Sequence, residues 1–421
     1  MFFPVAYLFD PSSLHIIIPI VTAILFYVKL MQTPKRNPKI HGNCDPEYKS
    51  VQDAFKRNFD EGWEEEGAAI AVFHKGRLVV DLWGGYSERR YDRPWRENTL
   101  ACVFSCTKSV GAICVAMLVD KGICKYDDRV EKYWPSYGKN GKEDTTIEMV
   151  LEHRRLELED LTDDMRMRKL IEDEKPNCLI GKHTGYHTLT YGWILDSIFQ
   201  SVDPNKRTIG EYLKEEIAGK YKLDIHMGKC EKEEYRFARL ANPSILLKIR
   251  EILSYPKNLI KIGSTALRPG GNFGRAIKNM RNFGVEFTSF NNPDLRIHSQ
   301  PAVNAISTAR ALADLHMKAF DGTLLSDKFV KTLKEPSHPN KFDRTLGERQ
   351  DKGKGFFYTK SPLDTWQIGH FGVGGQIVRY DFENQLSIAY LCNGMKIGVH
   401  KYVETYNRLE RRIYESFKLK Q

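Results

Sequence analysis

The stretch FSCTKSVGAICVAMLVDKG, residues Phe104–Gly122, combines a helical pattern with two reactive side chains. Its apolar residues recur at helical spacing (i, i+3, i+4, i+7, i+8), at Val110, Ile113, Cys114, Met117 and Leu118. This spacing predicts a helix with one buried apolar face. Gly122 suits the position just after a helix C-terminus, where the backbone is often left-handed. Ser105 and Lys108 stand one turn apart at the start of this predicted helix.

Ser105 and Lys108 form a chemically coherent pair. A serine hydroxyl is a weak nucleophile at neutral pH and needs a base. A lysine three residues later lies on the same helical face, within reach of the serine oxygen. Burial and the positive end of the helix dipole both favour the neutral amine, which can accept a proton. Backbone N–H groups at the same N-terminus can stabilise an oxyanion. The alternative is a chance Ser-x-x-Lys at the beginning of an ordinary helix.

The composition is that of a globular protein, with one large domain or two closely packed ones. The chain has 421 residues, of which 28% are charged and 41% hydrophobic. The net charge is +10, but basic residues are mixed with acidic ones along the chain, so a nucleic-acid partner is not predicted. None of the eight cysteines forms a C-x-x-C pair, and His183 and His187 lack the glutamate of a zinc motif. A metal site is therefore not predicted.

The N-terminus differs from the rest of the chain. Residues Ser12–Val28 carry no formal charge, although Pro19 interrupts them. We expect an uncleaved single-pass membrane anchor within residues 1–32; a signal peptide is the second interpretation. A polar linker is expected over residues 33–45. The basic residues after the apolar stretch favour a body on the cytosolic side of the membrane: Lys29, Lys35, Arg36 and Lys39.

The body, residues 46–421, has strand patterns at both ends. Residues 67–86 are two apolar runs split by Lys-Gly, which predicts a β-hairpin. Residues 365–395 predict two or three strands with tight turns, and residues 402–419 a basic amphipathic helix. Helical patterns and loops fill the region between, approximately residues 126–334. The predicted fold is α/β (α+β), with an antiparallel sheet formed from both ends of the body, flanking helices and a mostly helical inserted lobe.

Three segments resemble the motifs of the serine β-lactamase and penicillin-binding-protein superfamily. Residues 104–135 are similar to its first motif, the one that carries the serine and the lysine. The segment GYHTLTYGWILDSI resembles the second motif, with Tyr186 as its tyrosine and Thr188 in place of the usual asparagine. The segment IGHFGVGGQ resembles the third, with His370-Phe371-Gly372 in place of Lys-Thr-Gly. The likeness is greatest to class C β-lactamases and β-lactamase-like carboxylesterases, a peptidase S12-like branch.

The resemblance implies a serine hydrolase of the β-lactamase/transpeptidase-like fold that needs no metal or organic cofactor. Ser105 would attack an ester or amide carbonyl, and Lys108 and Tyr186 would move the protons. The N–H groups of Ser105 and Val373 would hold the oxyanion. At the substrate pocket, Gly372 would let the substrate come close to the backbone. His370 would shape the side of the pocket that holds the carboxylate or the leaving group.

The substrate is expected to be a small-molecule or peptide acyl compound. The predicted anchor and the variant second and third motifs favour an ester, a peptide or a lipid-like acyl group over a lactam. The alternative is a catalytically inactive, membrane-tethered scaffold of the same fold, assembling as a homo-oligomer or with other partners. The joint presence of Ser105, Lys108 and Tyr186 argues against a scaffold, which needs none of the three.

Overall fold

The computed structural model describes residues 38–151, 164–175, 184–256 and 286–418, together with the isolated positions 19 and 22. The predicted anchor lies outside this part of the chain, apart from those two positions. Among the residues described, none of the helices is both long enough and apolar enough to cross a membrane.

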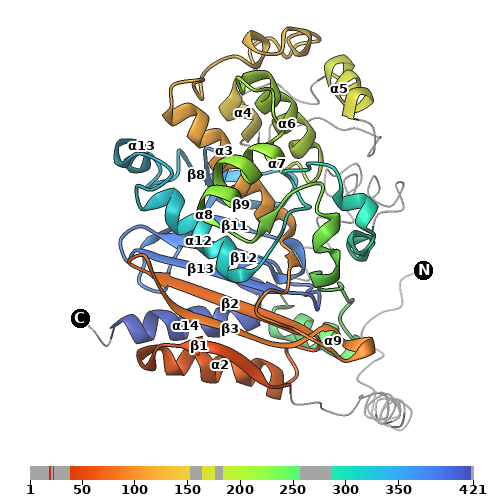
Figure 1. The fold of residues 1–421 in the computed structure, drawn as a ribbon, viewed down its shortest axis with the longest axis vertical. Helices are drawn as coiled ribbons and strands as arrows, with labels where there is room; N and C mark the ends of the chain where they lie inside the picture. Colours follow the sequence, from red (N-terminus) through yellow and green to blue (C-terminus); the bar gives the residue numbers. More distant parts are fainter. Residues whose placement is uncertain are drawn as a thin grey trace, which may run out of the picture.

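An antiparallel sheet forms the centre of the molecule (Figure 1). In spatial order its strands are β1 (Ile40–Cys44), β3 (Arg77–Glu88), β2 (Gly67–His74), β13 (Leu386–Cys392), β12 (Ile377–Asp381), β11 (Trp366–Phe371), β10 (Phe356–Lys360), β9 (Glu348–Gly353) and β8 (His338–Asp343), with the short β4 (Arg93–Pro94) beside β3. The N-terminal strand β2 pairs with the C-terminal strand β13. The expectation of one sheet built from both ends of the body is therefore confirmed.

Helices cover both faces of this sheet (Figure 1). On one face, α2 (Lys49–Asp60) and α14 (Glu404–Lys418) lie side by side. On the other, α12 (Ala309–Phe320) packs on β2, β12 and β13. The helical lobe lies beyond α12 and contains α3 (Thr107–Asp120), α4 (Ile147–Leu151), α5 (Asp164–Asp173), α6 (Thr190–Val202), α7 (Ile209–Tyr212), α8 (Gly219–Tyr221), α13 (Asp327–Lys331) and the small sheet of β5 (Ala101–Cys102), β7 (Ile306–Ser307) and β6 (Ile225–His226). Helix α9 (Ile245–Ser254) lies apart from this lobe, near the end of α2 (Figure 1).

The predicted hairpin is present as β2 and β3. Its turn residues Lys75 and Gly76 have φ angles of 50° and 77°. Two consecutive positive φ angles define the type I′ turn, whose twist matches that of the flanking strands. One neighbouring prediction differs from the structure: Ile40–Cys44, within the expected linker, forms strand β1 on the outer edge of β3. Its half-exposed polar sequence has no apolar alternation, so the strand gives no signal of its own.

Helix α3 ends as predicted but is buried differently. Gly122 has a φ of 72°, and its N–H donates to the Val119 carbonyl at 2.9 Å while Ile123 reaches back to Leu118 at 3.0 Å. This is the Schellman motif that a glycine permits. The expectation of a single buried face is wrong, because every residue from Thr107 to Leu118 is buried. The sheet and the lobe enclose the helix on all sides, so its polar residues are buried too.

Candidate active site

The candidate nucleophile lies on a strained turn. Ser105 is the middle residue of the single-turn helix η4 (Phe104–Cys106) that leads into α3. Phe104 has a φ of 44°, a left-handed conformation that costs a non-glycine residue about 1–3 kcal/mol. Its buried ring packs edge-on against Phe290 and Phe287, with centroids 5.7 and 6.1 Å away. This packing holds the turn in place, so Ser105 is half-exposed between two buried neighbours.

The amine of Lys108 is surrounded by oxygen atoms. The side chain is fully buried, and Nζ lies 3.2 Å from Ser105 Oγ. Nζ also donates to the backbone carbonyls of Thr188 at 3.0 Å and Ala302 at 2.8 Å. Burial lowers the pKa of Lys108 well below its ordinary value. A neutral amine has two N–H groups and one lone pair. Since the two carbonyls take the two N–H groups, the lone pair is left for the Ser105 hydroxyl.

Tyr186 completes this cluster. Its ring centroid lies 4.8 Å from Lys108 Nζ. Burial raises the pKa of the Tyr186 phenol, and a hydrogen bond with Ser105 acts in the opposite direction without cancelling the rise. Burial thus favours the neutral form of both the amine and the phenol, and the neutral phenol is a proton donor. Tyr191, the second residue of α6, is also buried, and its ring centroid lies 5.6 Å from Lys108 Nζ.

Strand β11 lies against the nucleophile turn. The Cys106 thiol donates to the His370 carbonyl at 3.5 Å. A Cβ added to Gly372 would lie 2.7 Å from the Val103 carbonyl oxygen and 3.1 Å from the Phe104 Cβ. The φ of Gly372 is −114°, which any residue can adopt. Space, rather than backbone conformation, therefore requires glycine at this position.

His370 is a buried, neutral side chain beside Tyr186. The two ring centroids are 6.2 Å apart. Burial lowers the pKa of His370 well below its ordinary value. Nδ1 lies 2.7 Å from the Phe371 carbonyl oxygen, so this nitrogen carries the hydrogen. Nε2 is then an acceptor, and no described residue donates to it.

The oxyanion site keeps the status of a prediction. Val373 is half-buried and begins the short helix η11 (Val373–Gly375), directly after Gly372. Gly374 and Gly375 have φ angles of 81° and 102°, which favour glycine. The structure brings Ser105, Lys108 and Tyr186 together and places the β11 segment beside them. The catalytic role of each residue is still inferred from chemistry.

A buried ion pair holds the Tyr186 loop, and the sequence reasoning did not identify it. Asp343, at the end of β8, accepts through Oδ1 from the N–H groups of Tyr186, Thr345 and Leu346 at 3.1, 2.9 and 2.8 Å. Its Oδ2 pairs with Lys352 of β9. Burial alone would raise the pKa of Asp343, but Lys352 and these N–H groups outweigh it and lower the pKa. In the sequence, Asp343 is seen only as an Asp before a polar turn. That pattern is common at strand ends and does not point to a functional site.

The side chains brought together at this site suit nucleophilic attack on a carbonyl group. Within the described ranges, His, Cys, Asp and Glu side chains nowhere gather in a group of three or more that could hold a metal ion. A half-exposed serine next to a buried neutral amine can attack a carbonyl carbon. A protonated phenol in contact with both can return the proton to a leaving group.

The fold and the placement of these residues define a class of protein: the β-lactamase/transpeptidase-like fold, with a serine and a lysine at the start of a buried helix. The family model described as Beta-lactamase matches residues 55–411, and the chain belongs to this family. The chain is 28% identical to the esterase/beta-lactamase LipL of Mycobacterium tuberculosis (strain ATCC 25618 / H37Rv) over 377 residues, 86% of this chain and 84% of that protein.

Two solved structures extend the comparison. A penicillin-binding protein homologue from Caulobacter crescentus matches with a TM-score of 0.75 and 27% identity, over 90% of this chain and 100% of the other. A family VIII carboxylesterase matches with a TM-score of 0.76 and 25% identity, over the same shares. These relatives support a hydrolase.

Proposed function

We propose that this chain is a serine hydrolase that forms an acyl-enzyme on Ser105. The observation that carries the proposal is the environment of Lys108: a buried amine with two backbone carbonyls on its N–H groups and the Ser105 hydroxyl at 3.2 Å. This arrangement supports a lysine that serves as base without a carboxylate partner.

The reaction follows from these contacts. Ser105 Oγ attacks the carbonyl carbon of an ester or amide, and its proton passes to the Lys108 amine. The carbonyl oxygen becomes an oxyanion. By the resemblance of their motifs, the N–H groups of Ser105 and Val373 would donate hydrogen bonds to it. When the tetrahedral intermediate collapses, Tyr186 protonates the leaving group and recovers a proton from Lys108. Water or another acceptor then releases the acyl group by the reverse path.

His370 bears on the substrate class. A neutral imidazole attracts a carboxylate far less than the lysine of the usual third motif would. Its Nε2 lone pair can instead accept a hydrogen bond from a hydroxyl or amide. We therefore propose neutral esters or amides, without a carboxylate near the leaving group, as preferred substrates. An ester pair that differs only in such a carboxylate tests this, and the neutral member should have the higher kcat/KM.

The experiment that tests the function is labelling with a fluorophosphonate probe, combined with turnover of short-chain p-nitrophenyl esters. We expect the full chain to label and to turn over ester, and Ser105→Ala to do neither. The matched control is Lys354→Met, since Lys354 also has a pKa lowered by burial but lies outside the site. If the wild-type chain neither labels nor hydrolyses any such ester, the proposal fails and an inactive fold takes its place.

A further inference from the structure

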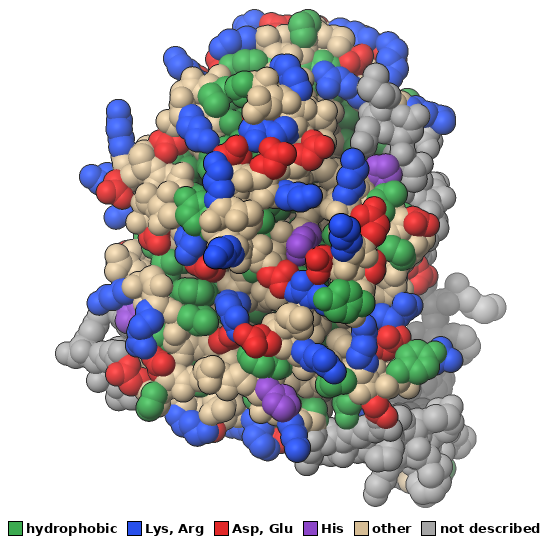
Figure 2. Space-filling model, in the orientation of Figure 1, with side chains coloured by type: hydrophobic (Ala, Val, Ile, Leu, Met, Phe, Trp, Pro, Cys, Tyr) green, Lys and Arg blue, Asp and Glu red, His purple; other side chains and the backbone are tan. Residues whose placement is uncertain are grey.

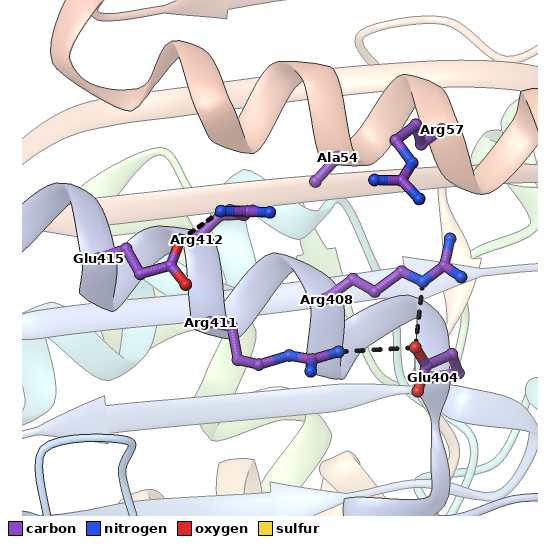
Figure 3. Close-up of a pocket in the computed structure, with 7 residues that line it drawn as sticks. All are labelled: Ala54, Arg57, Glu404, Arg408, Arg411, Arg412 and Glu415. Carbon is purple, nitrogen blue, oxygen red and sulfur yellow. Dashed lines mark hydrogen bonds and ion pairs between the residues drawn. The ribbon is translucent and has the colours of Figure 1, made fainter.

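A groove lined by arginines lies on the side of the sheet away from α3. It has a volume of about 280 Å³ and lies between α2 and α14 (Figure 3). We call it the arginine groove, after Arg57 of α2 and Arg408, Arg411 and Arg412 of α14. The guanidinium groups of Arg57, Arg408 and Arg412 turn toward the space between the helices (Figure 3). The small side chain of Ala54 leaves this space open.

The arginine groove has an excess of positive charge. Its four guanidinium groups form ion pairs with three carboxylates, those of Glu61, Glu404 and Glu415. Each guanidinium has five N–H groups. Within the described chain, Arg412 donates through one nitrogen, Nη1, to Glu415 at 2.6 Å. On the face drawn in Figure 2, basic and acidic side chains are interspersed. The arginine groove instead concentrates donors that suit the oxygens of a phosphate.

Helix α9 exposes an apolar surface. Four of its side chains, which we call the apolar stripe, are 70%, 40%, 43% and 73% exposed: Ile245, Leu246, Ile249 and Leu253. On the opposite side of α9, Leu247 and Glu251 are buried. A helix that turns Ile and Leu outward along one line has the pattern of an interfacial helix.

The arginine groove and the apolar stripe belong to one end of the molecule. Tyr255, just after α9, donates to Glu404 at 2.6 Å, and Arg250 of α9 donates to the Glu61 carbonyl at 2.5 Å. Glu61 and Glu404 are themselves carboxylates of the arginine groove. Helix α9, which carries the stripe, is therefore joined to the groove by direct contacts, and Figure 1 shows α9 near the end of α2.

The first strand of the described body, β1, begins at this same end. Ile40 begins β1 beside Gly84: a Cβ on Gly84 would lie 2.6 Å from Ile40 Cδ1 and 3.5 Å from the ring of Phe59. Phe59 is in the last turn of α2, two residues before Glu61. The described body thus begins near the end of α2 that the groove and α9 share.

We propose that the apolar stripe and the arginine groove dock the body on an anionic phospholipid surface. The stripe would enter the boundary between headgroups and acyl chains, and the arginines would bind lipid phosphates. The positive charge of the arginine groove favours an anionic lipid surface over residues 257–285 of this chain, which are themselves basic. It also disfavours a second copy of the chain, whose groove carries the same positive charge. The proposal is independent of the hydrolase activity.

A fluorescent label on the stripe tests the docking in the full chain. We would label Leu253→Cys with an environment-sensitive dye and use Lys328→Cys, exposed on α13, as the matched position. Phosphatidylcholine vesicles that contain phosphatidylserine should raise and blue-shift the emission at position 253, with no change at position 328. Vesicles of phosphatidylcholine alone should give a much smaller response.

Charge reversal separates the contribution of the arginine groove. Arg411→Glu/Arg412→Glu should weaken partitioning by at least about 25-fold, which corresponds to about 1 kcal/mol for each basic residue near an anionic surface. Lys328→Glu/Lys331→Glu makes the same change in net charge on α13 and should have little effect. An equal response to neutral vesicles, or no effect of the arginine reversal, would overturn the proposal. Release by inorganic phosphate at constant ionic strength would assign the groove to a free anion instead.

Discussion

The buried pair of Asp343 and Lys352 makes a strong prediction about the loop that carries Tyr186. Replacing Asp343 with Asn removes the charge but keeps an oxygen that can accept from the Tyr186 N–H. Lys352 is then a buried ammonium with no compensating carboxylate. Its side chain is 5% exposed and that of Asp343 is 0% exposed, so water cannot take over the lost interaction.

The expected magnitude follows from that burial. Breaking one side of a buried pair costs about 3–5 kcal/mol of folding free energy, whereas replacing both partners with neutral side chains is often close to neutral. Asp343→Asn should therefore lower the free energy of unfolding by about 3–5 kcal/mol. The double variant Asp343→Asn/Lys352→Met should recover most of this loss, because the unpaired charge is gone.

Urea unfolding of the two variants and the wild type measures both effects, and the pH dependence adds a second test. Since the folded pKa of Asp343 is lowered from 3.8, its contribution is present above that pH and is lost as the pH falls through the folded pKa. The difference in free energy of unfolding between the wild type and Asp343→Asn should thus become smaller as the pH falls. If the single variant loses less than about 1 kcal/mol, or the double variant is no more stable than the single one, the pair does not hold the loop as described.

Three further predictions concern the site itself. Lys108→Met should slow acylation about 10²–10⁴-fold. The rate at which the wild type is labelled by the probe, measured at fixed times, should rise with pH through the lowered pKa of Lys108 and then stay level through neutral pH. A labelling rate that rises only near the ordinary lysine pKa would contradict the role of Lys108 as base. Tyr186→Phe keeps the ring beside Lys108 and should reduce ester turnover while leaving the thermal unfolding midpoint nearly unchanged; equal turnover would remove Tyr186 from the proton path. Gly372→Ala should cost about 1–3 kcal/mol through its contact with the Val103 carbonyl and reduce labelling; an alanine variant with wild-type stability would contradict that contact.

The sequence predicts the parts of the fold that have strong local patterns. The Lys75-Gly76 turn between two apolar runs predicts the central hairpin. Residues 365–395 predict two or three strands, and the structure has three there, β11, β12 and β13. The edge strands are missed for a physical reason. Ile40–Cys44 and His338–Asp343 are polar and largely exposed, so neither shows the alternation that marks a half-buried strand. Their pairing depends on the neighbouring strands and not on their own composition.

The candidate site, like the fold, could be predicted from the sequence only in part. The spacing of Ser105 and Lys108 is local and visible in the sequence, and the resemblance adds Tyr186. The two carbonyls that bind the Lys108 amine belong to Thr188 and Ala302, which are 80 and 194 residues further along the chain. They act through the backbone, which any residue type supplies. No pattern of side chains could therefore have predicted them.

Burial favours the neutral forms of the titratable groups around Ser105, and this has a mechanistic consequence. Burial disfavours the charged forms of Lys108, Tyr186 and His370 alike, lowering the pKa of the two bases and raising that of the phenol. Charge then appears only during the reaction, when the amine gains a proton and the carbonyl oxygen becomes negative. In a buried environment, opposite charges created close together attract more strongly than in water. In the proposed mechanism, the burial of α3 on all sides favours the neutral, basic form of Lys108 at rest and would strengthen its attraction to the oxyanion as the transition state forms.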